Sequence, residues 1–320
     1  MIDTNRKRLL VGAVCYLGMI GFFLLTRGGF YSNFLAYICL FIIAGHGWNL
    51  LGGYVGEISF GHAAFFGIGA YSVGLPIAYG FTGVPLLVLV VLGGFMAGFF
   101  ALLLSGPLLR VKGFPFLVGT YGIGFVMQSV VVNTQALYAT RGIFIPPFSQ
   151  TALYLIIFGV TVGTTLFVAW LVEQNVGLRF RAVRDVPTAA QMIGISIFRT
   201  KAVALILGAF ICGIAGGLFA LYGSFVQPSS AFGFGTSISI LLGPYIGGVG
   251  TVLGPVLGTW IVITLQEYAR SSITITGGHH FALGALLVFV MMVNREGVYP
   301  GVRKLVRRLA RKWARKRTAA

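Results

Sequence analysis

The stretch FLAYICLFIIAGHGWNLLGGYVGEISFGHAAFFGIGAY, residues 34–71, contains two long apolar runs separated by one glycine-rich interruption. Each run is close to the ~20 apolar residues that an α-helix needs to cross a bilayer. Soluble domains carry about 25% charged residues, whereas only 9% of these 320 residues are charged and 57% are hydrophobic. The stretch and the composition therefore predict a membrane protein built from helices.

Apolar runs of this length recur along the chain. Clear candidates cover residues 9–25, 34–51, 60–79, 84–104, 114–132, 153–172, 202–226 and 281–293. A longer block, 237–268, is cut by two glycine-containing breaks, at 247–250 and at Gly254-Pro255, so it forms either two short crossings or one re-entrant hairpin. The pattern predicts an all-α, polytopic membrane helical bundle with eight to ten transmembrane spans and with broken helices.

The basic residues sort by membrane side. The chain has 23 Lys and Arg against 6 Asp and Glu, and the basic residues cluster near 6–8, 110–112 and 179–201 and from 295 to the end. With the N-terminus inside, 20 of the 23 lie on one side, and only Arg27, Arg141 and Arg270 lie on the other. Because Lys and Arg favour cytoplasmic loops, both termini are expected in the cytoplasm. The net charge of +17 thus reflects topology, and we expect no nucleic-acid partner.

The chain divides into a transmembrane domain, residues 1–294, and a basic tail, residues 295–320. Apolar residues recur in the tail at nearly helical spacing among Lys and Arg. The tail is therefore expected to form an amphipathic cytoplasmic helix on anionic lipid headgroups. A solvated anchor that only fixes the topology is the alternative.

Two glycine clusters, residues 52–57 and 247–254, interrupt apolar runs. Broken helices at membrane depth need protein or water around them to satisfy the freed backbone groups, so the clusters are candidates for a translocation path. Ionisable or polar residues beside the first cluster join the candidates, because such residues in membrane segments are costly and often functional. For the ionisable ones, a satisfied role at the membrane interface is an equal alternative. The candidate path residues are Gly52, Gly53, Gly56, Glu57, Ser59, His62, Gly247, Gly248 and Gly250.

The sequence offers no constellation for covalent chemistry. Ser59 and His62 are three residues apart and could share a helix face, but no third orienting group or nucleophile elbow accompanies them. The three Cys residues fall within apolar runs and suggest no metal site. A phosphate-binding glycine loop is also absent from the sequence. We therefore expect a transport subunit without cofactor or metal, which depends on other chains for any ATP hydrolysis.

The segment 177–195 is the longest internal cytoplasmic loop. Asp185 is a suitable N-cap, Pro187 is tolerated in a first turn, and Gly194 suits a C-terminal cap. These residues predict a short helix over 186–193. Such a helix is a compact knob that could seat in a groove of a partner; a surface linker is the alternative.

Three stretches, in the expected order, resemble branched-chain amino acid ABC-importer permeases of the LivM type. They are the signature-like run 49–71, the Ala-Ala-x-x-x-Gly pattern at 189–194, and the glycine-rich run 247–258. The resemblance covers about 30–295. It implies an ATPase-coupling loop that contains Arg184, Asp185, Ala189, Ala190 and Gly194. Related loops often carry an acid directly before the Ala-Ala pair, where this chain has Pro187-Thr188 and its nearest acid is Asp185.

The resemblance also implies partners and a place in the cell. The chain would be a multi-pass subunit of the bacterial inner membrane that pairs with a second, LivH-like permease. Two cytoplasmic ATPase subunits would drive the pair, and an extracytoplasmic solute-binding protein would select the amino acid. A urea or short-amide permease of the same superfamily is the close alternative. A self-powered secondary transporter or channel is the distant one, because the sequence shows no Asp/Glu/His chain suited to a proton relay.

Overall fold

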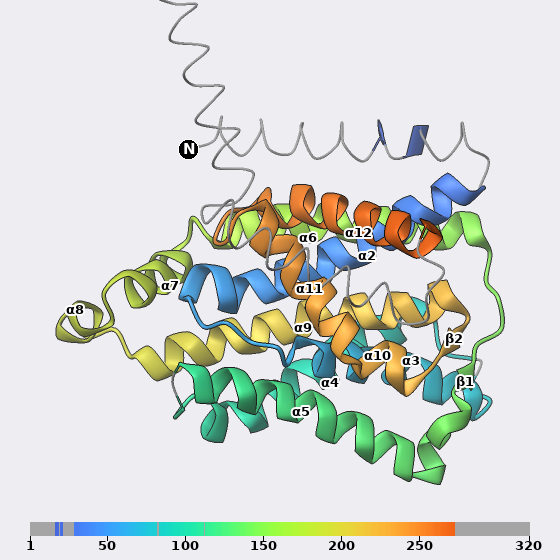
Figure 1. Ribbon diagram of the computed structural model, residues 1–320, viewed down its shortest axis with the longest axis horizontal. Helices are drawn as coiled ribbons and strands as arrows, with labels where there is room; N and C mark the ends of the chain where they lie inside the picture. The colour runs from blue at the N-terminus through green and yellow to red at the C-terminus, as the bar shows by residue number, and fades with distance from the viewer. Residues whose placement is uncertain (1–16, 19, 22–28, 82, 112, 273–320) are drawn as a thin grey trace, which may run out of the picture.

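The computed structural model describes residues 17–18, 20–21, 29–81, 83–111 and 113–272. Most of the predicted span 9–25, the predicted span 281–293 and the tail 295–320 lie outside the described residues. Within them, the predicted helical membrane bundle is confirmed (Figure 1). Five helical segments are long and apolar enough to cross a membrane: Phe30–Val55, Leu86–Leu108, Phe114–Asn133, Gln150–Leu171 and Ile197–Gly223.

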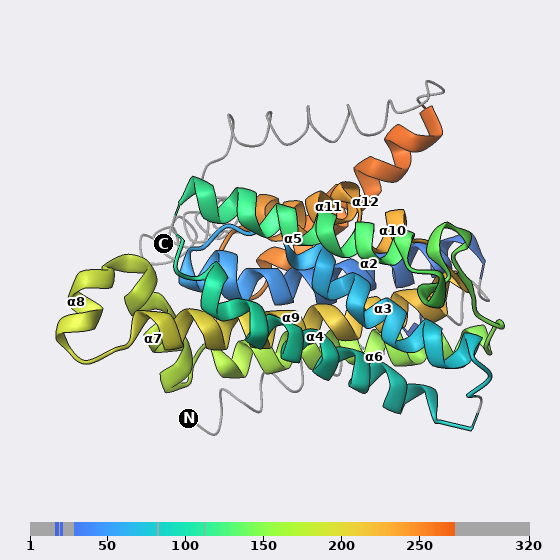
Figure 2. The same cartoon turned by 90° about the horizontal axis from the view of Figure 1, so that it is seen from below.

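The bundle contains eight principal helices in its described part, most of which run roughly along the long axis of the molecule (Figures 1 and 2). They are α2 (Phe30–Asn49), α3 (His62–Ala78), α4 (Leu86–Leu108), α5 (Phe114–Asn133), α6 (Gln150–Leu171), α9 (Ile197–Gly223), α11 (Phe234–Gly247) and α12 (Gly254–Ser272). A π-helix, η1 (Leu50–Val55), continues α2. The shorter elements are η2 (Gln135–Leu137), η3 (Ala139–Arg141), β1 (Ile143–Phe144), α7 (Asn175–Asp185), α8 (Pro187–Met192), β2 (Phe225–Val226) and α10 (Pro228–Phe232).

Helix α9 packs against α2, α3 and α4 with its backbone close to theirs. A Cβ atom added at Gly213 of α9 would lie 2.7 Å from the carbonyl oxygen of Gly93 in α4. One added at Gly47 of α2 would lie 2.5 Å from the carbonyl oxygen of Gly208. In lipid no hydrophobic force drives helices together, so small residues that allow such close contact stabilise the bundle through van der Waals packing.

The block 237–268 is broken where the glycines predicted a break. Helices α11 and α12 form a hairpin joined by residues 248–253, and Gly248 and Gly250 adopt positive φ angles of +128° and +72°. The two helices touch through small residues, since a Cβ atom at Gly258 would meet the carbonyl oxygen of Gly243. The two helices of the hairpin are therefore packed with their backbones in close contact.

The first interruption differs from the prediction. The chain stays helical through Gly52 and Gly53 as η1, and the helix ends at Gly56, whose φ is +88°. The non-helical segment is 56–61, and α3 begins at His62. The glycines at 52 and 53 widen the helix instead of breaking it, because their lack of side chains leaves room for neighbouring groups: a Cβ atom at Gly52 would lie 2.5 Å from the Trp48 indole.

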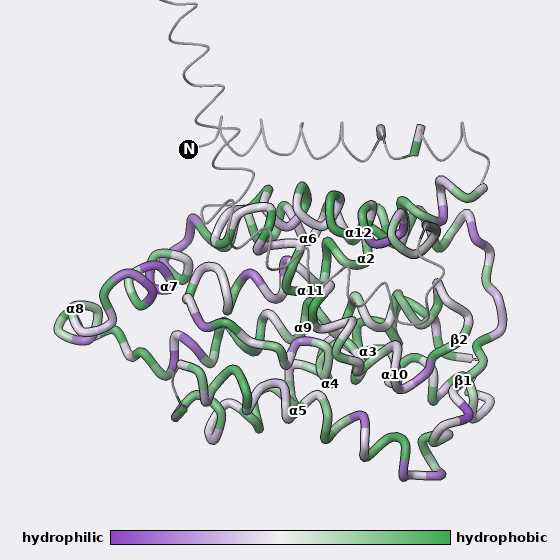
Figure 3. The backbone as a smooth tube through the Cα atoms, viewed as in Figure 1, coloured by the Kyte–Doolittle hydropathy of each residue, from purple (hydrophilic) through white to green (hydrophobic). Residues whose placement is uncertain are grey.

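The two ends of the bundle differ in charge and structure. Helices α4 and α9 are antiparallel, so the α4–α5 connection and the start of α9 lie at the end that carries α7 and α8 (Figure 1). That end, called here the basic end, holds Arg110, Arg179, Arg181, Arg184, Arg199 and Lys201. The opposite end carries η3 with Arg141 and a small sheet, in which β1 and β2 pair antiparallel with Ile143 opposite Val226. Figure 3 shows apolar residues concentrated along the helices between the two ends.

Candidate functional site

Helices α7 and α8 form a hairpin that projects from the basic end of the bundle (Figures 1 and 2). The short helix predicted over 186–193 is present as α8, Pro187–Met192, and Gly194 ends it with a φ of +83°. Ala190 is buried, Ala189 is exposed, and Met192 and its neighbour Ile193 are 88% and 75% exposed. Two large apolar side chains are therefore exposed at the tip of the hairpin.

Two details of this hairpin were not predicted. Asp185 is the last residue of α7 and pairs with Arg184, whose Nε donates to Asp185 Oδ1 at 3.0 Å, and Val186 occupies the N-cap position of α8. The N-cap role predicted for Asp185 is therefore wrong. Helix α7 itself lies where the sequence analysis predicts a loop between two spans. Its signal was the buried trio Gly177, Phe180 and Val183, spaced three apart as on one helix face.

Three parts of the chain meet beside this hairpin, at a site called here the glycine junction: Asn49, Gly53, Arg184, Gly250 and Thr251. Arg184 Nη1 donates to the carbonyl oxygen of Gly53 at 3.2 Å. The backbone N–H of Gly250 donates to Asn49 Oδ1 at 2.9 Å, and Asn49 Nδ2 donates to the carbonyl oxygen of Thr251 at 2.8 Å. The junction joins η1, α7 and the α11–α12 connection.

The non-helical segment 56–61 runs from the junction into the bundle, and several of its backbone groups are bonded to side chains. Trp48 Nε1 donates to the carbonyl oxygen of Ser59 at 2.7 Å. The N–H of Phe60 donates to Thr120 Oγ1 at 3.1 Å, and Ser237 Oγ donates to the carbonyl oxygen of Phe60 at 2.7 Å. Irregular backbone at membrane depth requires such partners, so α2, α5 and α11 together hold the break open.

The ionisable candidates near this segment have different surroundings. Glu57 forms an ion pair with Lys201 at the start of α9, and the two side chains are 18% and 10% exposed. His62 is 1% exposed and packs against the Phe65 ring, and within the described residues neither of its ring nitrogens has a hydrogen-bond partner. Ser59 Oγ accepts from the N–H of Gly61 instead of bonding to His62.

Three of the glycines predicted for the path, Gly53, Gly56 and Gly250, lie beside Arg184. Gly53 and Gly250 approach each other closely, because a Cβ atom at Gly53 would lie 2.6 Å from the nitrogen of Gly250. Gly56 lies against Arg184, whose Cγ would be 2.9 Å from an added Cβ atom. The glycines predicted for the path and the arginine predicted for coupling, which are far apart in the sequence, are in contact at the basic end.

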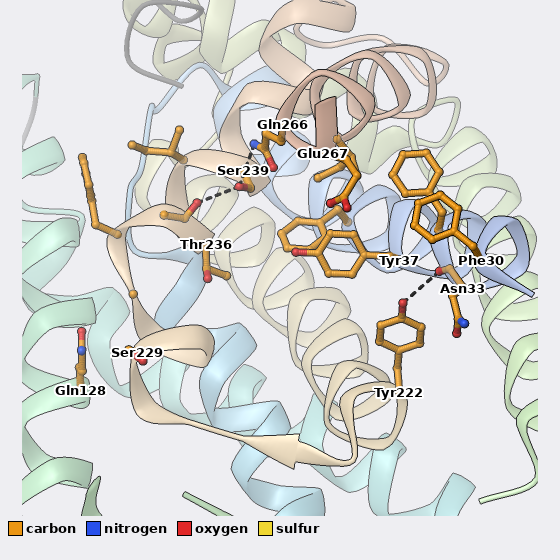
Figure 4. A pocket seen from close by; sticks show the side chains of 17 residues that line it. Phe30, Asn33, Tyr37, Gln128, Tyr222, Ser229, Thr236, Ser239, Gln266 and Glu267 are labelled. Carbon is orange, nitrogen blue, oxygen red and sulfur yellow. Dashed lines mark hydrogen bonds between the residues drawn. The ribbon is translucent and has the colours of Figure 1, made fainter. Parts of the chain in front are cut away.

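An open cavity of about 850 Å³ lies toward the opposite end (Figure 4). Its walls come from α2, α5, α11 and α12, from the end of α9, and from the α10 region. The lining side chains combine aromatic rings with uncharged polar groups and one acid. The lining residues are Phe30, Asn33, Phe34, Tyr37, Phe41, Gln128, Tyr222, Ser229, Gly233, Phe234, Gly235, Thr236, Ile238, Ser239, Ile263, Gln266 and Glu267.

Several polar groups around the cavity are held by hydrogen bonds. Tyr222 Oη donates to the carbonyl oxygen of Asn33 at 3.0 Å, and Gln266 Nε2 donates to Ser239 Oγ at 3.1 Å (Figure 4). None of the predicted path residues lines the cavity. The signal that sequence reasoning passed over was the pair of amides in mainly apolar segments, Asn33 and Gln128, since polar residues within membrane helices are often functional.

The sequence was compared with protein families and with individual proteins of known role. The family model described as branched-chain amino acid transport system / permease component matches residues 30–293. The chain is 26% identical to the high-affinity branched-chain amino acid transport system permease protein LivM of Escherichia coli (strain K12), over 94% of this chain and 77% of that protein. It is 22% identical to the corresponding LivH of Salmonella typhimurium, over 81% of this chain and 91% of that protein.

A relative with a different printed role also matches. The autoinducer 2 import system permease protein LsrC of Enterobacter sp. (strain 638) is 26% identical over 71% of this chain and 68% of that protein. No solved structure matches the chain. The family match spans the helices, the glycine junction and the cavity described above, and on that basis the chain belongs to the family of branched-chain amino acid transport system permease components.

Proposed function

We propose that this chain is the membrane permease subunit of an ATP-driven importer for branched-chain amino acids. It is a transport subunit and not an enzyme, as its family membership states. Its proposed partners are a second, LivH-like permease, two cytoplasmic ATPase subunits and an extracytoplasmic solute-binding protein. The observation that carries the proposal is the α7–α8 hairpin, which offers an exposed apolar tip and is bonded through Arg184 to Gly53 of η1.

The proposed topology is a multi-pass inner-membrane protein with ten spans and both termini in the cytoplasm. The α11–α12 connection supports this, because Gly250 lies beside Arg184 at the basic end, so that α11 approaches that end and α12 leaves it. Eight principal helices plus the spans predicted at 9–25 and 281–293 give the ten. The cluster of basic side chains at the α7–α8 end supports its cytoplasmic placement.

The proposed path includes the cavity and the glycine junction at its cytoplasmic end. Ligand cavities typically measure roughly 300–1,000 Å³ and combine apolar walls with a few placed polar groups. The volume of about 850 Å³ and the aromatic and amide lining fit a small solute with an apolar side chain and polar ends. Aliphatic amino acids have this chemistry, whereas urea lacks the apolar part.

The main experiment measures uptake by the complete complex. The permease pair and the ATPases are reconstituted in proteoliposomes with ATP inside and the binding protein outside, and uptake of labelled leucine is followed. Uptake that requires ATP and the binding protein is the expected result. Uptake of leucine by this chain alone, driven by an ion gradient, would refute the proposal in favour of a secondary transporter. Transport of urea but not leucine would favour the amide permease.

A filled cavity tests whether it lies on the path. Ile238→Trp adds bulk to the cavity wall and is expected to lower leucine uptake at least tenfold. The matched control is Leu102→Trp on α4, where the side chain is 52% exposed and does not line the cavity. Equal uptake by the two variants, at equal amounts in the membrane, would place the path elsewhere.

A further inference from the structure

We propose that Asn49, the last residue of α2, is a positioning residue that holds the α11–α12 connection against the start of η1, so that a displacement of the α7–α8 hairpin reaches both the η1 end and the α11–α12 connection together. This inference rests on the proposed function, because it concerns how ATPase-driven motion reaches the path. It adds a residue that neither the coupling pattern nor the glycine clusters contain.

The side chain of Asn49 is fully buried, and both its amide oxygen and its amide nitrogen form hydrogen bonds. It is 0% exposed, and it bonds backbone groups of Gly250 and Thr251, which are 201 and 202 residues further along the chain. The bonds run in opposite directions: the amide oxygen accepts from one residue and the amide nitrogen donates to the next. Only an uncharged amide of this length supplies a donor and an acceptor there, because a carboxylate has no donor and a hydroxyl does not reach both groups.

The segment that Asn49 holds is itself tied into a unit. Thr251 Oγ1 donates to the carbonyl oxygen of Gly248 at 2.7 Å and accepts from the N–H of Gly254 at 3.0 Å. Gly248 follows the last residue of α11, and Gly254 is the first residue of α12. A force applied to Gly250 through Asn49 therefore acts on the end of one helix and the start of the next.

The hairpin reaches the same point from the other side. Arg184 at the end of α7 donates to the carbonyl oxygen of Gly53, one turn after Asn49. A Cβ atom at Gly250 would lie 2.7 Å from Arg184 Nη1 and 2.9 Å from the carbonyl oxygen of Gly53. Since there is no room for a side chain between them, α7, η1 and the α11–α12 connection are in direct contact, and movement of one displaces the others.

A positioning role and a merely structural role predict different measurements. Loss of structure reduces the amount of assembled complex, and it reduces uptake and ATP hydrolysis in the same proportion. Loss of positioning leaves an assembled complex that hydrolyses ATP without moving solute. The quantity that separates them is the number of leucine molecules taken up per ATP hydrolysed.

The experiment uses the full chain in the reconstituted complex. Asn49→Asp keeps the shape and removes the donor to Thr251, and Gly250→Ala places a methyl group in the contact. We expect both to lower leucine uptake per ATP at least tenfold. The matched control for the second is Gly80→Ala, since Gly80 has a similar φ of +85° but no atom within 4 Å of an added Cβ. The control for the first is Thr161→Val, a buried hydroxyl of α6 outside the junction. Both controls should keep the wild-type ratio.

Each outcome decides one question. Wild-type complex that takes up no leucine with ATP would overturn the proposed function itself. Wild-type complex that works, with Asn49→Asp and Gly250→Ala at the wild-type ratio, would overturn only the positioning role. The positioning role is also overturned if both variants fail to assemble while Gly80→Ala assembles, because Asn49 would then be structural. If Asn49→Asp alone fails to assemble, the number of leucine molecules taken up per ATP by Gly250→Ala decides: a tenfold loss supports the positioning role, and the wild-type ratio overturns it.

Discussion

The ion pair between Glu57 and Lys201 gives a sharp test of the bundle near the junction. Removing one partner of a buried pair strands the other charge and costs about 3–5 kcal/mol, whereas exposed pairs contribute only about 0–1 kcal/mol. These side chains are 18% and 10% exposed, so they are mostly but not wholly buried. We therefore expect the lower end of the buried range, about 3 kcal/mol, for Lys201→Met. That is roughly a hundredfold change in the unfolding equilibrium.

The measurement is the free energy of unfolding of the purified chain in mixed micelles, titrated with a denaturing detergent and followed by tryptophan fluorescence. Glu57→Gln should cost a similar amount, because it leaves Lys201 charged and unpaired. The double variant Glu57→Gln, Lys201→Met should recover to within about 1 kcal/mol of wild type, since neither charge remains buried. Single variants that cost less than about 1 kcal/mol, or a double variant equal to their sum, would refute the view that the two charges depend on each other.

The hairpin, the topology and the cavity each give a further test. Gly194→Leu should be inserted normally yet lose most ATP-driven uptake, because Leu resists the φ of +83° that ends α8. No atom lies within 4 Å of an added Cβ atom, so the side chain itself causes no clash within this chain. Wild-type uptake by this variant would favour the surface-linker alternative. Ser149→Cys and Ala189→Cys should differ in labelling by an impermeant thiol reagent in intact cells, and equal labelling would contradict the proposed topology. The permease pair without its binding protein should bind leucine at about millimolar Kd, near −4 kcal/mol, by isothermal titration calorimetry, and micromolar binding would show that the permease itself selects the solute.

The positions of the long helices could be predicted from the sequence because the requirement is local. A segment in lipid must bond its backbone internally and present apolar side chains, and both conditions are met or failed within about 20 residues. The runs at 84–104 and 114–132 accordingly became α4 and α5 with small shifts at their ends. The break in 237–268 was equally local, since two positive φ angles require glycine there.

The exact place of the first break could not be predicted in this way. Apolar content alone predicts a break at residues 52–57, whereas the non-helical segment of the structure is 56–61. That shift depends on Trp48, Thr120 and Ser237, which supply bonds to the freed backbone from three different helices. Helix α7 was not predicted for a similar reason. Its buried face, Gly177, Phe180 and Val183, is recognised only when the elements packed against it are known.

The composition and the order of apolar runs are thus sufficient to predict that the chain is a helical membrane protein and that its basic residues gather on one side. The glycine junction and the cavity come only from tertiary structure. Asn49 bonds Gly250 and Thr251 across more than 200 residues, and the cavity walls are drawn from six regions of the chain. Apolar burial in lipid is a property of each segment, whereas a buried hydrogen bond depends on which distant group the fold brings within about 3 Å.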